Sequence, residues 1–161
     1  MDFAAAALAA LLAGAEAGAS TAAGAASAAT EEVPVKILVG QVSGGHPAQL
    51  AIAADRLPKT ASGAVLLFDV TPRSIVPEEH FGLGVAAAAG ALRETIATMT
   101  FYPPAQEGVT VTLAAPVSAP LLAAAHQAGM LTIELRLLVS AGDEAALRSV
   151  LVVDHATLHG S

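Results

Sequence analysis

The stretch from residue 84 to residue 116 constrains the fold of this 161-residue chain more than any other. It begins with an apolar run from Val85 to Met99 that is mostly alanine, with its larger apolar side chains at helical spacing. Alanine has the highest helix propensity and the smallest side chain, so a helix here can approach its neighbours closely. Valine and leucine then alternate with threonine over residues 109–113, which predicts a strand over residues 108–116. A close-packing helix that leads into a strand is the core unit of an α/β sheet.

Similar units extend on both sides of this stretch. Apolar strand patterns alternate with helical patterns, and glycine or proline separates them. We expect strands over residues 33–39, 64–70, 108–116, 130–139 and 150–153, and helices over residues 47–57, 85–99 and 121–128. Ser118 and Gly129 supply cap residues for the last helix. Strands that alternate with helices favour βαβ units and a mostly parallel sheet.

Composition excludes several functions. Apolar residues make up 55% of the chain, but aromatic residues only 3%, so the core must consist mainly of alanine, leucine and valine. The formal net charge is −7, with only seven Lys and Arg residues, which argues against nucleic acid or an anionic membrane surface as a partner. The chain has no cysteine, which excludes disulfides, thiolate chemistry and a cysteine-based zinc site.

The N-terminal region is distinct in composition. We expect residues 1–30 to form an alanine-rich helix and a flexible connection, followed by a domain over residues 31–161. The apolar run at residues 3–15 could alternatively be the core of a signal sequence. No Lys or Arg precedes it, Glu16 ends it, and it is shorter than the roughly 20 residues that span a bilayer. We therefore favour an amphipathic helix and a cytoplasmic protein.

Several fragments, taken in chain order, resemble one known family. They are Asp2 with the alanine run after it, the strand and glycine loop at 33–44, the strand at 62–68, the segment 91–116 that ends in Ala115-Pro116, and the strand at 150–154. Together they resemble a short-chain dehydrogenase/reductase that has lost its first βαβ segment. The resemblance implies a Rossmann-like α/β domain, with a mostly parallel sheet flanked by helices and without the first dinucleotide loop. It also implies cofactor contacts at Asp2 and Pro116.

The chain departs from the active members of that family. The positions that correspond to the catalytic Tyr and Lys hold Val85 and Ala89, and neither residue can act as an acid or an electrostatic partner. The single tyrosine is Tyr102, and the lysines, Lys36 and Lys59, lie elsewhere. The resemblance therefore implies the fold without a catalytic residue. It implies no cofactor for the chain alone, and NAD(P) only if a partner completes the site.

Two main function classes follow. The first is a non-catalytic subunit that joins a dehydrogenase/reductase subunit, or a second copy of itself, through the helix at residues 85–99. The alanine face of that helix is too extensive for one sheet to cover, and exposed apolar faces usually mark interfaces. The alternative is a divergent NAD(P)-dependent oxidoreductase acting on a carbonyl or hydroxyl substrate. A third interpretation is a fragment of an ordinary reductase.

Four other groups are weaker candidates for a site. The glycine loop at 40–45 could hold an anion at a helix N-terminus, with His46 beside it, and His155 with His159 has a spacing that suits a metal on a helix. The run Glu78-Glu79-His80 could supply an acid/base pair, and His126 lies in a short helix. Each group has a simpler explanation. The glycine loop can be an ordinary tight turn, the two C-terminal histidines a solvated tail, residues 78–80 a polar loop, and His126 a surface residue. We therefore predict no metal site.

Overall fold

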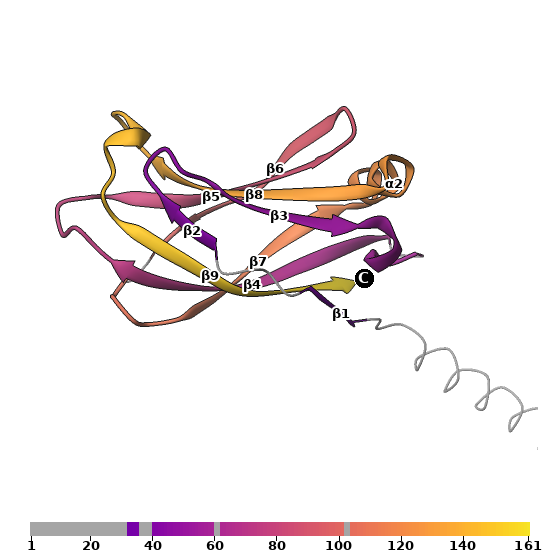
Figure 1. Cartoon of the computed structure of the whole chain (residues 1–161), viewed down its shortest axis with the longest axis horizontal. Helices are drawn as coiled ribbons and strands as arrows, with labels where there is room; N and C mark the ends of the chain where they lie inside the picture. The colour runs from indigo at the N-terminus through magenta and orange to yellow at the C-terminus, as the bar shows by residue number, and fades with distance from the viewer. Residues whose placement is uncertain (1–31, 36–39, 60–61, 102–103) are drawn as a thin grey trace, which may run out of the picture. The chain divides into compact units, whose positions relative to one another are not determined.

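The computed structural model describes residues 32–35, 40–59, 62–101 and 104–161. These residues belong to one compact unit, Glu32–Ser161. The predicted N-terminal helix and connection, together with Asp2 and Tyr102, lie outside the described residues. Within that unit, two antiparallel sheets pack face to face as a β-sandwich (Figure 1).

The first sheet, sheet A, is built around the C-terminal strand. Its strands are β1 (Glu32–Val35), β2 (Gly40–Ser43), β4 (Gly63–Ser74), β7 (Val111–Ser118) and β9 (Val150–Gly160). They lie in the order β1-β9-β4-β7, and β2 also pairs with β9. Because β1 pairs with the C-terminal half of β9 and β2 with its N-terminal half, the two short strands share one position. Sheet A is therefore four strands wide.

The second sheet, sheet B, has four strands in the order β3-β8-β5-β6. They are β3 (Ala48–Ala53), β5 (Phe81–Ala89), β6 (Leu92–Thr100) and β8 (Met130–Val139). The described residues contain one α-helix, α2 (Ala119–Ala128), and two 3-10 turns, η1 (Ala54–Arg56) and η2 (Glu144–Ala146). None of the helices in this part of the chain is long and apolar enough to cross a membrane.

The strand pairs are nested along the chain. β5 pairs with β6, β4 with β7, β3 with β8 and β2 with β9, all antiparallel. The chain is thus a long two-stranded ribbon, folded back at the β5–β6 turn and rolled so that alternate pairs fall in opposite sheets. This is the jelly-roll arrangement, which pairs most strand edges within two sheets.

The core fills the space between the two sheets. Every second residue along the strands points inward, so each strand contributes an alternating set of Leu, Val, Ile and Ala side chains. Phe68 is the largest buried side chain. Leu121, Leu122 and Ala125 of α2 complete the core at one end of the sandwich. The predicted core of alanine, leucine and valine is confirmed for the residues that the structure describes.

The predicted Rossmann-like fold with a mostly parallel sheet is wrong. All strand pairs of the described residues are antiparallel, and helices do not cover the outer faces of the sheets. The alternation in β8 indicated an antiparallel sheet. Its residues are buried at every second position, and most of the side chains between them are polar. One solvated face is typical of antiparallel sheets, whereas parallel sheets are buried on both faces.

The predicted helix at residues 85–99 is wrong as well. This segment forms most of the hairpin of β5 and β6, whose turn contains Gly90 at a φ of 59°. A positive φ suits glycine and interrupts a right-handed helix. Val85, Ala87 and Ala89 point into the core, so sheet packing outweighs the helix propensity of alanine. β6 also contains several threonines, which favour strands.

The helix predicted over residues 47–57 is also wrong, because that segment forms β3 and η1. Other local predictions agree with the structure. The strand at 130–139 and the helix at 121–128 are confirmed as β8 and α2. Ser118 Oγ accepts a hydrogen bond from Leu121 N at 3.4 Å, and Gly129 ends the helix at a φ of 84°. Strands β4, β7 and β9 cover or overlap the predicted segments but extend further.

Candidate functional site

The outer face of sheet B carries a shallow track with a floor of small residues. Along β5, the alternate residues Leu83, Val85, Ala87 and Ala89 are buried in the core. The residues between them are therefore on the outer face, and they are Gly82, Gly84, Ala86 and Ala88; the two alanines are half-buried, whereas neighbouring residues bury the two glycines. Larger outward-facing side chains of β3, β6 and β8 border this floor: Gln49, Arg93, Thr95, Thr98, Thr100, Thr132, Glu134, Arg136 and Leu138. We call this surface the channel.

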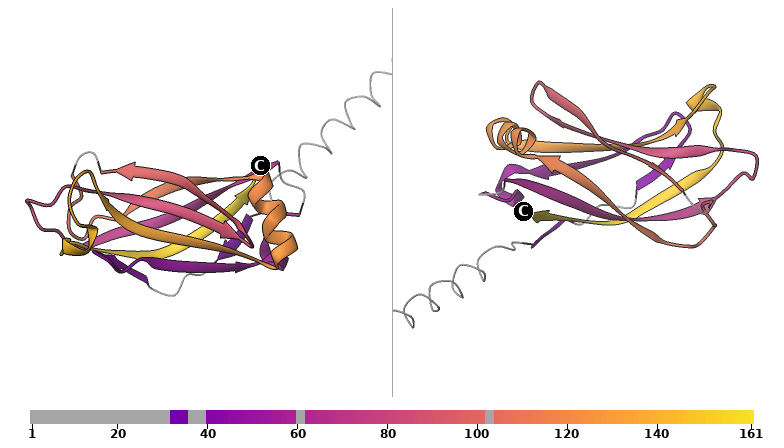
Figure 2. Two further views of the ribbon diagram at one scale, coloured as in Figure 1. Left: turned by 90° about the horizontal axis from the view of Figure 1, so that it is seen from above. Right: turned by 180° about the vertical axis from the view of Figure 1, so that it is seen from behind.

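Elements at both ends of sheet B flank the channel. The β5–β6 turn and α2 stand at one end, and the loop that contains η2 stands at the other (Figures 1 and 2). Figure 2 shows the same arrangement from above and from behind, so these elements do not merely overlap in one view. The floor along β5 thus runs between two raised ends.

A polar cluster lies at the Ala88 end of the channel. Glu134 Oε2 accepts a hydrogen bond from Gln49 Nε2 at 3.2 Å, and Glu134 Oε1 pairs with Arg93 Nη2 at 3.0 Å. The three side chains come from β3, β8 and β6, and they surround a hollow of about 150 Å³ over Ala86 and Ala88. Amide, carboxylate and guanidinium groups side by side can exchange hydrogen bonds with the hydroxyl groups of a ligand.

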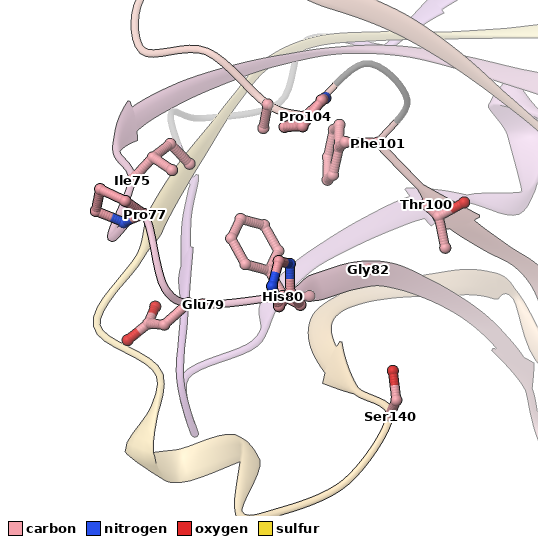
Figure 3. Close-up of a pocket in the computed structure, with 11 residues that line it drawn as sticks. Ile75, Pro77, Glu79, His80, Gly82, Thr100, Phe101, Pro104 and Ser140 are labelled. Atoms are coloured by element: carbon pink, nitrogen blue, oxygen red, sulfur yellow. The ribbon is translucent and has the colours of Figure 1, made fainter.

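A larger cavity of about 550 Å³ lies at the opposite end (Figure 3). The loops that follow β4, β6 and β8 surround it. Phe81 and Phe101 meet edge to face there, with ring centroids 5.9 Å apart and planes at 66°. Gly82 and Thr100 line this cavity and also belong to the channel, so the cavity continues the channel at this end. The site therefore combines a polar cluster, a floor of small residues and an end with two phenyl rings.

Glu79 braces the loops around this cavity. Its carboxylate accepts hydrogen bonds from Ser149 Oγ at 2.7 Å and from Arg148 N and Ser149 N at 2.9 Å each. Burial raises the pKa of Glu79, but these hydrogen bonds and the Arg148 charge outweigh burial, so the pKa lies below its ordinary value of 4.5. In Figure 3 the carboxylate points away from Phe101. Glu79 thus holds the start of β9 to the β4–β5 loop.

The chain resembles known proteins in its fold and not in its sequence. No family model matches the sequence, and no curated protein sequence matches it. The fold resembles that of a xylan-binding module. This structure, CBM15, superposes on the chain with a TM-score of 0.58 at 11% identity. The match covers 82% of this chain and 97% of the module. Xylanase10C from Cellvibrio japonicus, a mutant in complex with xylopentaose, matches with a TM-score of 0.51 at 13% identity, over 82% of this chain and 23% of that enzyme.

The β-sandwich overturns the predicted function. A non-catalytic subunit of a dehydrogenase/reductase, and its alternative of a divergent NAD(P)-dependent oxidoreductase, both required the Rossmann-like sheet, and the likeness is to a xylan-binding module instead. The resemblance to the short-chain dehydrogenase/reductase family was wrong. Contact with another subunit through residues 85–99 stays a prediction, but the helix that motivated it is a hairpin.

The structure separates Pro116, one of the two predicted cofactor contacts, from the channel. Pro116 lies exposed on β7, opposite Val65, in the other sheet, and Asp2 lies outside the described residues. The glycine loop at 40–45 is partly β2 and leads into β3, so no helix N-terminus follows it. His46 is exposed beside that turn, with Nδ1 3.0 Å from Gly44 O. Pro116, the glycine loop and His46 do not converge on one site.

The other histidine candidates are also dispersed. His155 and His159 lie on the extended strand β9, where their spacing does not have the geometry of a helix, and His159 Nε2 is 3.0 Å from Thr157 Oγ1. His126 Nε2 is 3.0 Å from Pro58 O. Within the ranges that the structure describes, no three His, Asp or Glu side chains are grouped so that they could hold a metal. Of the predicted acid/base run, Glu79 is the brace, while His80 lines the cavity.

The residues of the polar cluster were not predicted from the sequence. Gln49 and Arg93 lie within two different predicted helices, residues 47–57 and 85–99, so no pattern placed either residue beside Glu134. The only available signal was in β8, where Thr132, Glu134 and Arg136 alternate with buried leucine and isoleucine. That signal marks a solvated sheet face, but it does not identify the strands beside it.

Proposed function

We propose that the chain is a carbohydrate-binding module that binds xylan along the channel of sheet B. The observation that carries the proposal is the channel itself, a floor of small residues bordered by polar side chains on the outer face of a sheet. The likeness in fold to the xylan-binding module, over nearly the whole of that module, supports the choice of ligand.

The dimensions of the channel suit an extended polysaccharide. From Gly82 to Ala88 the floor is roughly 20 Å long, at about 3.3 Å per residue. Ala86 and Ala88 project little from the sheet, so a sugar ring can lie close to the backbone there, whereas Leu138 covers Gly84 in the middle of the floor. The hollow over Ala86 and Ala88 lies near one end of this stretch and the cavity at Gly82 at the other, so a chain of several linked sugars could reach both.

The chemistry of the two ends is complementary to a sugar chain. Hydroxyl groups of xylose can donate to the Glu134 carboxylate and accept from Gln49 and Arg93. The apolar faces of sugar rings can lie against Phe101 at the cavity end. Net hydrogen bonds of about 1 kcal/mol each, on a surface with few aromatic side chains, predict weak binding in the range of roughly millimolar to micromolar Kd.

The polar cluster provides the test. Gln49→Ala removes one side of the cluster, and Gln41→Ala is a matched control because Gln41 is exposed on β2 in the other sheet. Titration with a linear xylooligosaccharide in a calorimeter should show that Gln49→Ala weakens binding by about five- to ten-fold, the equivalent of one hydrogen bond. Gln41→Ala should leave the affinity unchanged.

Two results would contradict the proposal. One is an unaltered protein that neither binds the oligosaccharide nor is retarded in a native gel containing xylan. The other is an equal loss of affinity in the two glutamine variants, since the binding surface would then lie outside the channel. Thermal melts of all three proteins show whether each variant remains folded.

A further inference from the structure

The channel has a charge opposite in sign to that of the whole chain. Three ionisable side chains face outward from the four strands of sheet B: Arg93, Glu134 and Arg136. Two guanidinium groups and one carboxylate give this face a net charge of +1, whereas the chain has a formal net charge of −7. Among the acidic residues that the structure describes, only Glu134 lies on the channel, and its charge is matched by Arg93.

The two arginines differ in their partners. Arg93 pairs with Glu134 at 3.0 Å, so the charges of these two side chains cancel. Arg136 is exposed and makes no ion pair or side-chain hydrogen bond with the other residues that the structure describes. The positive charge of the channel is therefore the charge of Arg136.

Arg136 is placed for a ligand that occupies the channel. It lies on β8 between Glu134 of the polar cluster and Ser140 of the cavity, and its strand partner is Gly84 on the floor. A Cβ atom at Gly84 would come within 2.7 Å of Leu138 Cδ1, so Leu138 packs over this glycine next to Arg136. A guanidinium group in this position is beside the middle of a bound chain.

We propose that the preferred ligand is a xylan whose backbone carries uronic acid side groups, and that Arg136 pairs with the uronate carboxylate. This inference rests on the proposed function. A guanidinium group presents N–H donors in a planar fork that matches the two oxygens of a carboxylate, while a neutral xylose hydroxyl uses only one of them. The polar cluster then binds the backbone, and Arg136 binds the branch.

The test compares two oligosaccharides of equal backbone length, one linear and neutral and one with a single glucuronic acid branch. The full-length chain should bind the acidic oligosaccharide about five-fold more tightly at low salt, as expected for an exposed ion pair. The preference should shrink at about 1 M salt, where the Debye length is about 3 Å. Arg136→Gln should abolish the preference, because it should lower the affinity for the acidic oligosaccharide more than the affinity for the neutral one.

Two further variants sharpen the result. Arg73→Gln is the matched control, because Arg73 is an exposed arginine near the end of β4 in the other sheet, and it should keep the preference. Arg136→Lys retains the charge but loses the fork, so it should keep only part of the preference. Thermal melts establish that each variant is folded before its affinities are compared.

The outcomes separate this inference from the proposed function. Equal affinity of the unaltered protein for both oligosaccharides would overturn the inference and leave xylan binding intact. A preference that survives in Arg136→Gln, or an equal loss for both ligands in that variant, would also overturn the assignment to Arg136. If neither oligosaccharide binds, the proposed function itself fails.

Discussion

Glu79 illustrates how a single side chain can hold the cavity end of the sandwich together. Its carboxylate bonds to two backbone N–H groups and one hydroxyl group of Arg148 and Ser149. Ser149 is fully buried, and its hydroxyl oxygen also accepts a hydrogen bond from Val76 N at 3.0 Å. Two loops that are distant in sequence therefore depend on one ionised group.

Glu79→Gln should destabilise the protein by about 1–3 kcal/mol at neutral pH, since charged hydrogen bonds to buried partners are lost or weakened. Because the folded-state pKa lies below 4.5, the stabilisation is complete above the ordinary value and is lost as the pH falls through the lowered one. The stability difference between the two proteins should thus shrink in acid. Urea unfolding at several pH values measures it.

Glu78→Gln is the control for this measurement, because Glu78 is the neighbouring, exposed carboxylate. It should change the stability little at any pH. A Glu79→Gln protein as stable as the unaltered one at neutral pH would show that the brace contributes nothing. A difference that grows in acid would contradict the lowered pKa.

At the scale of elements, the β5–β6 hairpin determines the depth of the channel. Its outward alanines form the floor beside the polar cluster. Ala86→Leu should fill the hollow and weaken xylan binding by at least ten-fold, because the added side chain occupies the space that the sugar needs. The expected cost in stability is small, since position 86 faces outward. Calorimetric titration with a xylooligosaccharide measures the effect.

Ala114→Leu is a matched variant on the other sheet, where Ala114 is exposed on β7 opposite Leu67. It adds the same side chain to an outer face and should leave binding unchanged. Unchanged binding in Ala86→Leu would place the sugar site elsewhere on the sandwich.

The elements that could be predicted from sequence are those with local signals. The helix α2 has a Ser118 cap and a terminal Gly129, and β8 alternates over its whole length. The hairpin could not be predicted in this way, because its alanines satisfy a helical pattern as well as a strand pattern. Only the packing of β5 between β6 and β8 selects the strand.

The candidate site depends even more on tertiary structure. Gln49, Arg93 and Glu134 are neighbours because β3, β8, β5 and β6 lie in that order, and a one-residue shift in register would turn any of them into the core. No spacing in the sequence encodes that order. The other candidates from the sequence, the run Glu78-Glu79-His80 and the pair His155 and His159, do not come together in this way.

For the whole molecule, the nested pairing means that most strand partners are far apart in sequence. The pairing of β2 with β9 brings Gly40 next to Val153, so it encloses the three inner strand pairs. Folding rates fall as contacts become less local, and β-sandwiches fold in about milliseconds to seconds. We expect refolding of this chain from denaturant in that range.

Stopped-flow refolding after a brief unfolding pulse tests this expectation, because a short pulse leaves the prolines in their native isomers and removes their slow phases. Refolding in microseconds would contradict it, since such rates belong to folds with mostly local contacts.

Because Glu32 pairs with His159, the first described strand of the sandwich begins beside the end of its last strand, β9. A short peptide could therefore join these two points, and the chain could instead be opened in the exposed loop around Gly142, without altering the order of strands in either sheet. The architecture is thus suited to circular permutation, and to insertion as a self-contained cassette within another polypeptide.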